Sequence, residues 1–200
     1  MNEDSDRDRE TGLDCYDPER RVFDEIPNKI GAGEGLSKQD VLLMLKWKLG
    51  RITNRNSQTV TDTNIRKINE AVKVARQNDR RIAALTALQD IPGIGLATAT
   101  VILTVCYPDA FTVIDWRVLS ELDLFPSNLS VAQQVFKRKS DDYNADDWTA
   151  ENYLSEFLPK VNACAKLWNC SLRDADRALW GLSVHRRIQE IIKESKNRHE

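Results

Sequence analysis

Apolar residues recur every three or four positions along most of this chain, which is the spacing of one face of an α-helix. The first clear run follows Ser37, which has Asp40 three residues later in the pattern of a helix-capping box. Val41 and Leu45 then repeat at helical spacing, and Gly50 is a residue type that commonly ends a helix. The pattern therefore predicts a helix that begins at Ser37 and ends at Gly50.

Similar patterns predict helices through most of the remaining chain. A second helix carries Ile65, Ile68, Val72 and Ala75 on one face and basic residues on the others. Later helices are predicted over about 81–89, 96–106, 115–124, 130–138, 150–168 and 172–195. No segment alternates as a β-strand does, so we expect an all-α fold.

The sequence Ile91-Pro92-Gly93-Ile94-Gly95 predicts a hairpin between two of these helices. Pro92 has a fixed φ and ends the first helix, while Gly93 and Gly95 permit backbone angles and close approach that a β-carbon prevents. The backbone N–H groups that start the next helix then bind a phosphate oxygen, directly or through a bridging monovalent cation at Gly93 and Gly95. A tight helix connection without a ligand is the alternative.

Apolar residues on both sides of the hairpin indicate a specific motif. Leu88 and Ile91 precede the turn, and Ala97 and Ala99 follow it, so the two helices are able to pack closely. The pattern over about 82–106 resembles the helix-hairpin-helix motif. That motif also occurs in polymerases, ligases and junction-binding proteins, where it is a non-catalytic clamp.

The residues after the second motif helix distinguish these uses. Tyr107 and Pro108 open a short loop, and an apolar stretch then leads to Asp115, which lies 23 residues after Pro92. In this order and spacing the segment resembles the HhH-GPD superfamily of base-excision DNA glycosylases, in its endonuclease III-like form. The resemblance is sharp over residues 82–122 and general elsewhere.

The resemblance implies a helical fold of two closely packed lobes, with Asp115 as the catalytic carboxylate. Cleavage of an N-glycosidic bond builds positive charge on the deoxyribose, which a carboxylate stabilises while it orients or deprotonates water. Relatives that also cut the strand carry a lysine where this chain has Ala97, so the resemblance implies a monofunctional enzyme. Asp115 also suits the N-cap of the helix that follows, and the two roles are compatible.

Several aromatic and basic residues are candidate DNA contacts or pocket walls. Trp116 and Arg117 directly follow the carboxylate, and Trp47 and Lys48 lie in the first predicted helix. Burial in the core is the alternative for both tryptophans, and for Trp116 we expect a buried anchor rather than a pocket wall. Trp180 lies on or beside the apolar stripe of the last helix, which predicts a core position.

The N-terminal segment differs in charge from the rest of the chain. Residues 1–27 carry ten acids against four arginines, so the rest of the chain is net +4 although the whole chain is −2. We expect residues 1–27 to form a disordered or loosely attached acidic arm and residues 28–200 to form the helical domain. The basic surplus lies mainly in residues 28–90, which favours a moderately basic face.

The cysteines and the apolar runs exclude several classes of protein. Cys15, Cys106, Cys164 and Cys170 lack the spacing of a four-thiolate cluster, so we expect no iron–sulfur centre and no other cofactor, with Cys106 as a core residue. No apolar run approaches the roughly 20 residues of a membrane span, and the N-terminus lacks a signal-peptide pattern. We expect a monomer without a membrane partner, in the cytoplasm or at the nucleoid.

These features together predict a monofunctional DNA N-glycosylase that acts on a damaged or modified base flipped out of duplex DNA. The alternative is a non-catalytic helix-hairpin-helix module that recognises damaged, modified or branched DNA. A helical protein-interaction adaptor is a third interpretation. It predicts no salt-dependent DNA binding, whereas the other two require such binding.

Overall fold

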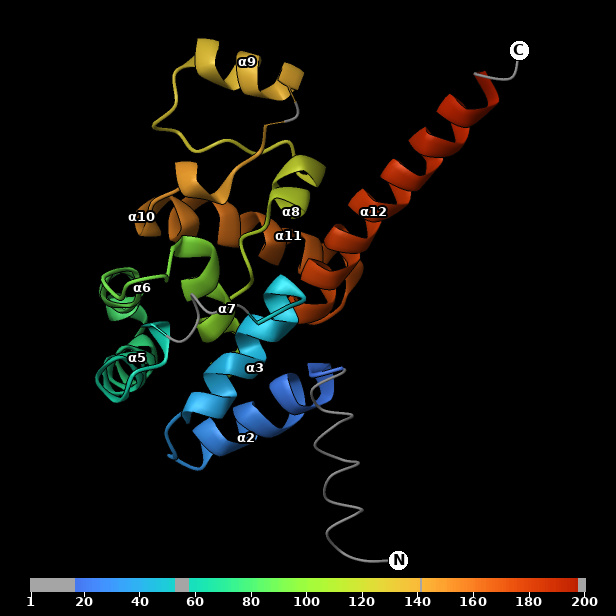
Figure 1. The fold of residues 1–200 in the computed structure, drawn as a ribbon. Coiled ribbons are helices and arrows are strands. Elements are labelled where there is room, and N and C mark those ends of the chain that lie inside the picture. The colour runs from blue at the N-terminus through green and yellow to red at the C-terminus, as the bar shows by residue number, and fades with distance from the viewer. Residues whose placement is uncertain (1–16, 53–57, 141, 198–200) are drawn as a thin grey trace, which may run out of the picture. The chain divides into compact units, whose positions relative to one another are not determined.

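The structure is a computed structural model that describes residues 17–52, 58–140 and 142–197. Every regular element in these ranges is a helix and none is a strand, which confirms the predicted all-α class. The chain divides into two compact units, Met1–Phe111 and Thr112–Glu200, whose helices are labelled in Figure 1. None of the described helices is both long and apolar enough to cross a membrane.

The first unit consists of helices that surround α7. Its elements are the π-helical turn η1 (Arg21–Glu25), α2 (Ile26–Gly31), α3 (Lys38–Leu49), α5 (Asp62–Ala75), the 3-10 turn η2 (Asn78–Arg80), α6 (Arg81–Gln89) and α7 (Leu96–Cys106). Helices α2, α3, α5 and α6 all contact α7. Residues 99–106 of α7 are buried on every side, which is the burial expected of a central helix. Cys106 lies in this stretch, so its predicted core position is confirmed.

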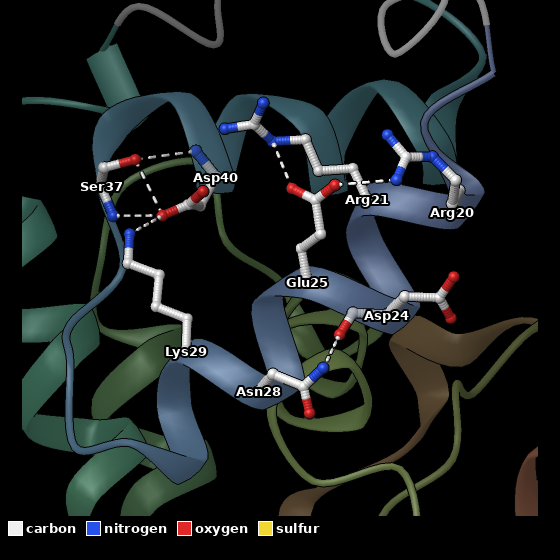
Figure 2. Close-up of polar contacts among 8 residues, drawn as sticks. All are labelled: Arg20, Arg21, Asp24, Glu25, Asn28, Lys29, Ser37 and Asp40. Carbon is white, nitrogen blue, oxygen red and sulfur yellow. Dashed lines mark hydrogen bonds and ion pairs between the residues drawn. The ribbon is translucent and has the colours of Figure 1, made fainter.

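The start of α3 is fixed by the capping box that the sequence predicts. The Ser37 hydroxyl accepts a hydrogen bond from the Asp40 backbone N–H, and the Asp40 carboxylate accepts one from the Ser37 backbone N–H. Gly50 ends the helix in the left-handed conformation, at φ 69°. Figure 2 shows that Lys29 of α2 reaches the same carboxylate, at 2.7 Å from Nζ to Oδ2.

The Asp40 carboxylate is buried and ionised. Burial alone would raise its pKa, but the hydrogen bonds from Lys29 and from the N–H and hydroxyl of Ser37 hold the pKa below its ordinary value. Since Lys29 belongs to α2 and Asp40 to α3, this ion pair joins the two helices. A buried carboxylate that lost its ammonium partner would be strongly unfavourable.

The expected boundary of the N-terminal arm at residue 27 does not match the structure. Residues 21–31 are helical, and Val22, Ile26 and Ile30 are buried in the first unit. Their spacing of four residues is a helical stripe that the acidic composition of the segment obscures. Residues 1–16 of the expected arm lie outside the described residues.

The second unit contains α8 (Trp116–Glu121), α9 (Val131–Ser140), the 3-10 turn η3 (Ala145–Asp147), α10 (Ala150–Asn152), the π-helical turn η4 (Tyr153–Phe157), α11 (Leu158–Trp168) and α12 (Leu172–Asn197). The helix predicted over 150–168 is therefore interrupted by a π-helical turn. The helix predicted over 115–124 ends at Glu121, because Asp123 adopts a positive φ of 49°. Helix α12 packs against α8 and α11.

Candidate functional site

The predicted hairpin between α6 and α7 is a tight β-turn. The Ile94 N–H donates to the Ile91 carbonyl at 3.0 Å, so residues 91–94 close a four-residue turn. Pro92 occupies the second position and Gly93 the third, where φ is +87°. This arrangement is that of a type II turn, which requires a positive φ at its third position and favours proline at its second. The geometry of the turn therefore explains why proline and glycine occupy these two positions.

Thr59 braces this turn from a distant part of the sequence. Its buried hydroxyl donates to the Pro92 carbonyl at 3.3 Å. A β-carbon on Gly93 would lie 2.7 Å from the same Thr59 oxygen, which is shorter than real contacts allow. No local pattern points to Thr59, because it precedes Pro92 by 33 residues. Gly93 is thus required by the fold, whatever the hairpin binds.

Gly95 differs from Gly93, because none of the residues that the structure describes requires a glycine there. It is the N-cap of α7 with φ −88° and ψ 178°, an extended conformation open to any residue. Apart from its neighbours in the chain, no described residue has an atom within 4 Å of a β-carbon added to Gly95. Serine, threonine, asparagine or aspartate is the usual N-cap, because its side chain accepts a hydrogen bond from the helix. The glycine leaves the outer side of the helix start open.

The first backbone amides of α7, which follow Gly95, are the candidate functional groups of the hairpin. Among the described residues no acceptor is found for the N–H groups of Leu96, Ala97 and Thr98, and the first bond of the helix runs from Ala99 N–H to the Gly95 carbonyl. Unpaired amides at a helix N-terminus carry partial positive charge. The arrangement can therefore bind an anion with the backbone alone.

The carbonyl groups of the hairpin determine where a cation fits. Those of Ile91, Pro92 and Gly95 accept hydrogen bonds within the protein. The carbonyls of Gly93 and Ile94 have no such donor in the described part of the chain. Of the two residues predicted to hold a bridging monovalent cation, Gly93 therefore has a carbonyl without a donor in the described residues, while the Gly95 carbonyl already accepts the Ala99 N–H. The Ile94 side chain is buried and anchors the turn.

Asp115 lies in the second unit at the end of an extended segment. The buried Tyr153 hydroxyl holds this segment by its backbone: it donates to the Thr112 carbonyl at 2.6 Å and accepts from the Thr112 N–H at 3.0 Å. Asp115 then caps α8, since its carboxylate accepts from the Arg117 N–H at 3.0 Å. The predicted N-cap is confirmed, and Asp115 itself is half-buried.

The two tryptophans expected in the core of this region are instead exposed. Trp116 is 48% exposed and Trp180 is 46% exposed, so both predictions of a core position are wrong. Trp180 belongs to α12 but lies outside its buried face. The Arg117 guanidinium lies 4.3 Å from the Trp116 ring centre and 5.4 Å from that of Trp180. Two exposed indole rings and one partly exposed cation therefore form a cluster next to Asp115, the Trp116–Arg117–Trp180 cluster.

The other aromatic candidate, Trp47, has a packing role. Its ring meets the ring of Phe23 edge to face, with centroids 4.9 Å apart, and it is only partly exposed. Lys48 beside it is also partly exposed. The structure thus groups the predicted residues into three places: the turn of residues 92–95, the start of α8, and the end of α3. In the described residues, no three or more His, Cys, Asp or Glu side chains are grouped to hold a metal ion.

The Tyr153 hydroxyl provides a direct test of how the segment before Asp115 is held. Tyr153→Phe should lower the free energy of unfolding by about 1–3 kcal/mol, because both backbone groups of Thr112 would lose a buried partner. Tyr143→Phe is the matched control, since the Tyr143 hydroxyl bonds Asp123 at the surface. Chemical denaturation of both variants should show a large shift for Tyr153 alone, and equal shifts would contradict the clamp.

Comparison with models of known protein families, with curated proteins and with solved structures finds no match for this chain. The geometry of the hairpin and of the segment around Asp115 is therefore the basis for interpreting the site.

Proposed function

We propose that this chain binds DNA through the hairpin of residues 92–95 and acts as a monofunctional DNA glycosylase of the HhH-GPD type. The observation that carries the proposal is the set of first α7 amides that have no acceptor among the described residues, next to the open side of Gly95. The catalytic half rests on the resemblance over residues 82–122 and on the position of Asp115 at the start of α8.

The hairpin suits a phosphate of the DNA backbone. A phosphate oxygen placed at the start of α7 accepts from the N–H groups of Leu96, Ala97 and Thr98 and is stabilised by the helix dipole. The contact uses main-chain atoms only, so it positions the DNA without reading its sequence. A monovalent cation at the Gly93 and Ile94 carbonyls would add positive charge between the turn and the phosphate.

Asp115 supplies the carboxylate for hydrolysis of the N-glycosidic bond. In the proposed step the bond between the sugar C1′ and the base breaks, the base leaves with the bonding electron pair, and water adds to C1′. The carboxylate stabilises the positive charge that develops on the sugar and takes a proton from the water. Ala97 cannot form a Schiff base, so the product is an intact abasic site.

The Trp116–Arg117–Trp180 cluster supports a nucleic-acid partner near this carboxylate. Indole rings provide flat surfaces on which unpaired bases stack, and a guanidinium pairs with phosphate. Both rings are about half exposed, so a base has access to them. A cluster of this kind suits an enzyme that takes its target base out of the duplex.

The second candidate function is a DNA-binding module without catalysis. The observation that favours it is the structural role of Asp115, whose carboxylate caps α8 and so has a reason to be present without any reaction. This candidate shares the hairpin and the salt-dependent DNA binding of the first. It differs in predicting no release of any base.

Base release from defined duplexes tests the proposal. The wild-type protein is incubated with duplexes that carry uracil, 8-oxoguanine, mismatched adenine, alkylated purines or modified cytosines, and abasic sites are revealed by alkali. We expect cleavage of one substrate after alkali and no strand cleavage without it. DNA binding that weakens with salt but releases no base would support the non-catalytic module, and absence of salt-dependent binding would contradict both.

A further inference from the structure

Helix α12 carries two apolar faces, of which its own unit uses one. Leu172, Ala175 and Leu179 are buried on the face that packs against α8 and α11. Arg186 continues this face, because it lies seven residues after Leu179 and its guanidinium pairs with Glu121 of α8 at 2.8 Å. Figure 1 shows the last turns of α12, in red, running past the helices that cover its first turns.

The second face consists of Val184, Ile188 and Ile191, with Ile192 at its edge. These residues recur at intervals of four and three, as on one side of a helix. Ile188 follows Leu179 by nine residues, which at 3.6 residues per turn is about two and a half turns, so the two residues lie on opposite sides of the helix. Ile188 is 49% exposed and Ile191 is 51% exposed.

One flank of this second face carries a pair of opposite charges. Arg187 and Glu194 are seven residues apart, so they lie on the same side of the stripe, one heptad from each other. Within the chain Arg187 pairs with Glu190 at 3.1 Å and with Glu194 at 3.9 Å. All three side chains are more than half exposed, so these pairs are weak and exchange readily.

The spacing of these residues is self-complementary when two copies of the helix run antiparallel. A two-fold axis that places Ile188 of one copy near Ile191 of the other also places Arg187 of each copy beside Glu194 of the other. Both ion pairs then form at once, as an isologous interface requires. A parallel arrangement would instead bring Arg187 beside Ile192 and form no such pair.

We propose that the Val184–Ile188–Ile191 face of α12 joins two copies of this chain in an antiparallel, two-fold symmetric dimer. The isoleucines form the apolar contact, and two reciprocal Arg187–Glu194 pairs set the direction of the helices. This dimer replaces the monomer expected from the sequence. It does not depend on the proposed DNA-binding function, because none of its residues belongs to the hairpin or to the start of α8. The small contact area predicts a reversible, concentration-dependent association.

Two charge reversals test the dimer with the full chain. In Arg187→Glu both reciprocal pairs become Glu opposite Glu, and in Glu194→Arg both become Arg opposite Arg, so each variant alone should be monomeric. An equimolar mixture of the two variants restores opposite charges at both pairs and should form a heterodimer. Sedimentation velocity over a range of protein concentrations measures all three samples and the wild type.

A matched control and a fold check complete the experiment. Lys193→Glu changes the charge of an exposed residue on the same helix but away from the stripe, and it should dimerise as the wild type does. Circular dichroism should show the same helix content in every variant. A wild type that stays monomeric at all concentrations would overturn the proposal, and so would a mixture that fails to associate while the wild type dimerises.

Discussion

Asp115→Asn should abolish base release while DNA binding stays close to that of the wild type. The variant keeps the size of the side chain but removes the negative charge and the proton acceptor. Loss of a general base or of transition-state charge stabilisation typically reduces a rate on the order of 10²–10⁴-fold. Single-turnover base release measures the rate, and fluorescence anisotropy with the same duplex measures binding.

The structure makes asparagine an informative replacement, because Asp115 also caps α8. Asparagine is as good an N-cap as aspartate, so its side-chain oxygen is still able to accept from the Arg117 N–H. Asp115→Ala serves as the comparison, since it removes the cap as well and should cost about 1 kcal/mol of stability. If Asp115 acts only as a cap, the asparagine variant will release base at the wild-type rate. That result would leave the non-catalytic module as the function.

Gly95→Asp should weaken DNA binding about tenfold or more without loss of stability. The new carboxylate would lie at the start of α7, accept from the amides that we assign to phosphate, and repel a phosphate that approaches them. Because aspartate is a better N-cap than glycine, the same change should stabilise the helix by a few tenths of a kcal/mol. Thermal unfolding and anisotropy at several salt concentrations separate the two effects.

Gly95→Asn is the matched control for the charge. Asparagine has the same shape and the same capping ability, so its loss of affinity should be clearly smaller than that of aspartate. Gly93 is a poor position for this test, because its φ of +87° and the nearby Thr59 hydroxyl make any side chain strain the turn. Wild-type affinity of Gly95→Asp at every salt concentration would show that the phosphate binds elsewhere.

The helix ends that were predicted correctly depend on local chemistry. Ser37 and Asp40 hold α3 by hydrogen bonds between residues three apart, and Gly50 ends it by its own conformational freedom. The hairpin is local in the same way, because Pro92 and Gly93 meet the requirements of one turn. Interactions within four residues leave a direct trace in the sequence, so these parts of the fold could be predicted from it.

The errors concern contacts between distant segments. Trp116 is expected as a buried anchor and Trp180 as part of the apolar stripe of its helix, yet both rings are exposed and contact the Arg117 guanidinium. The hydrogen bond from Thr59 to Pro92 joins residues 33 positions apart, so no local sequence pattern predicts it. In the N-terminal segment the four-residue spacing of Val22 and Ile26 does indicate a helix. The acidic composition of the same segment favours a disordered arm, which is the prediction that the structure corrects.

The ion pair between Lys29 and Asp40 determines how far the chain can be shortened from its N-terminus. A protein that begins after α2 would lack Val22, Ile26 and Ile30, and its first unit would expose the apolar surface that these residues cover. It would also leave Asp40 as a buried negative charge without its ammonium partner. A shortened form suited to expression should therefore begin before Pro18, well ahead of the change in composition at residue 27.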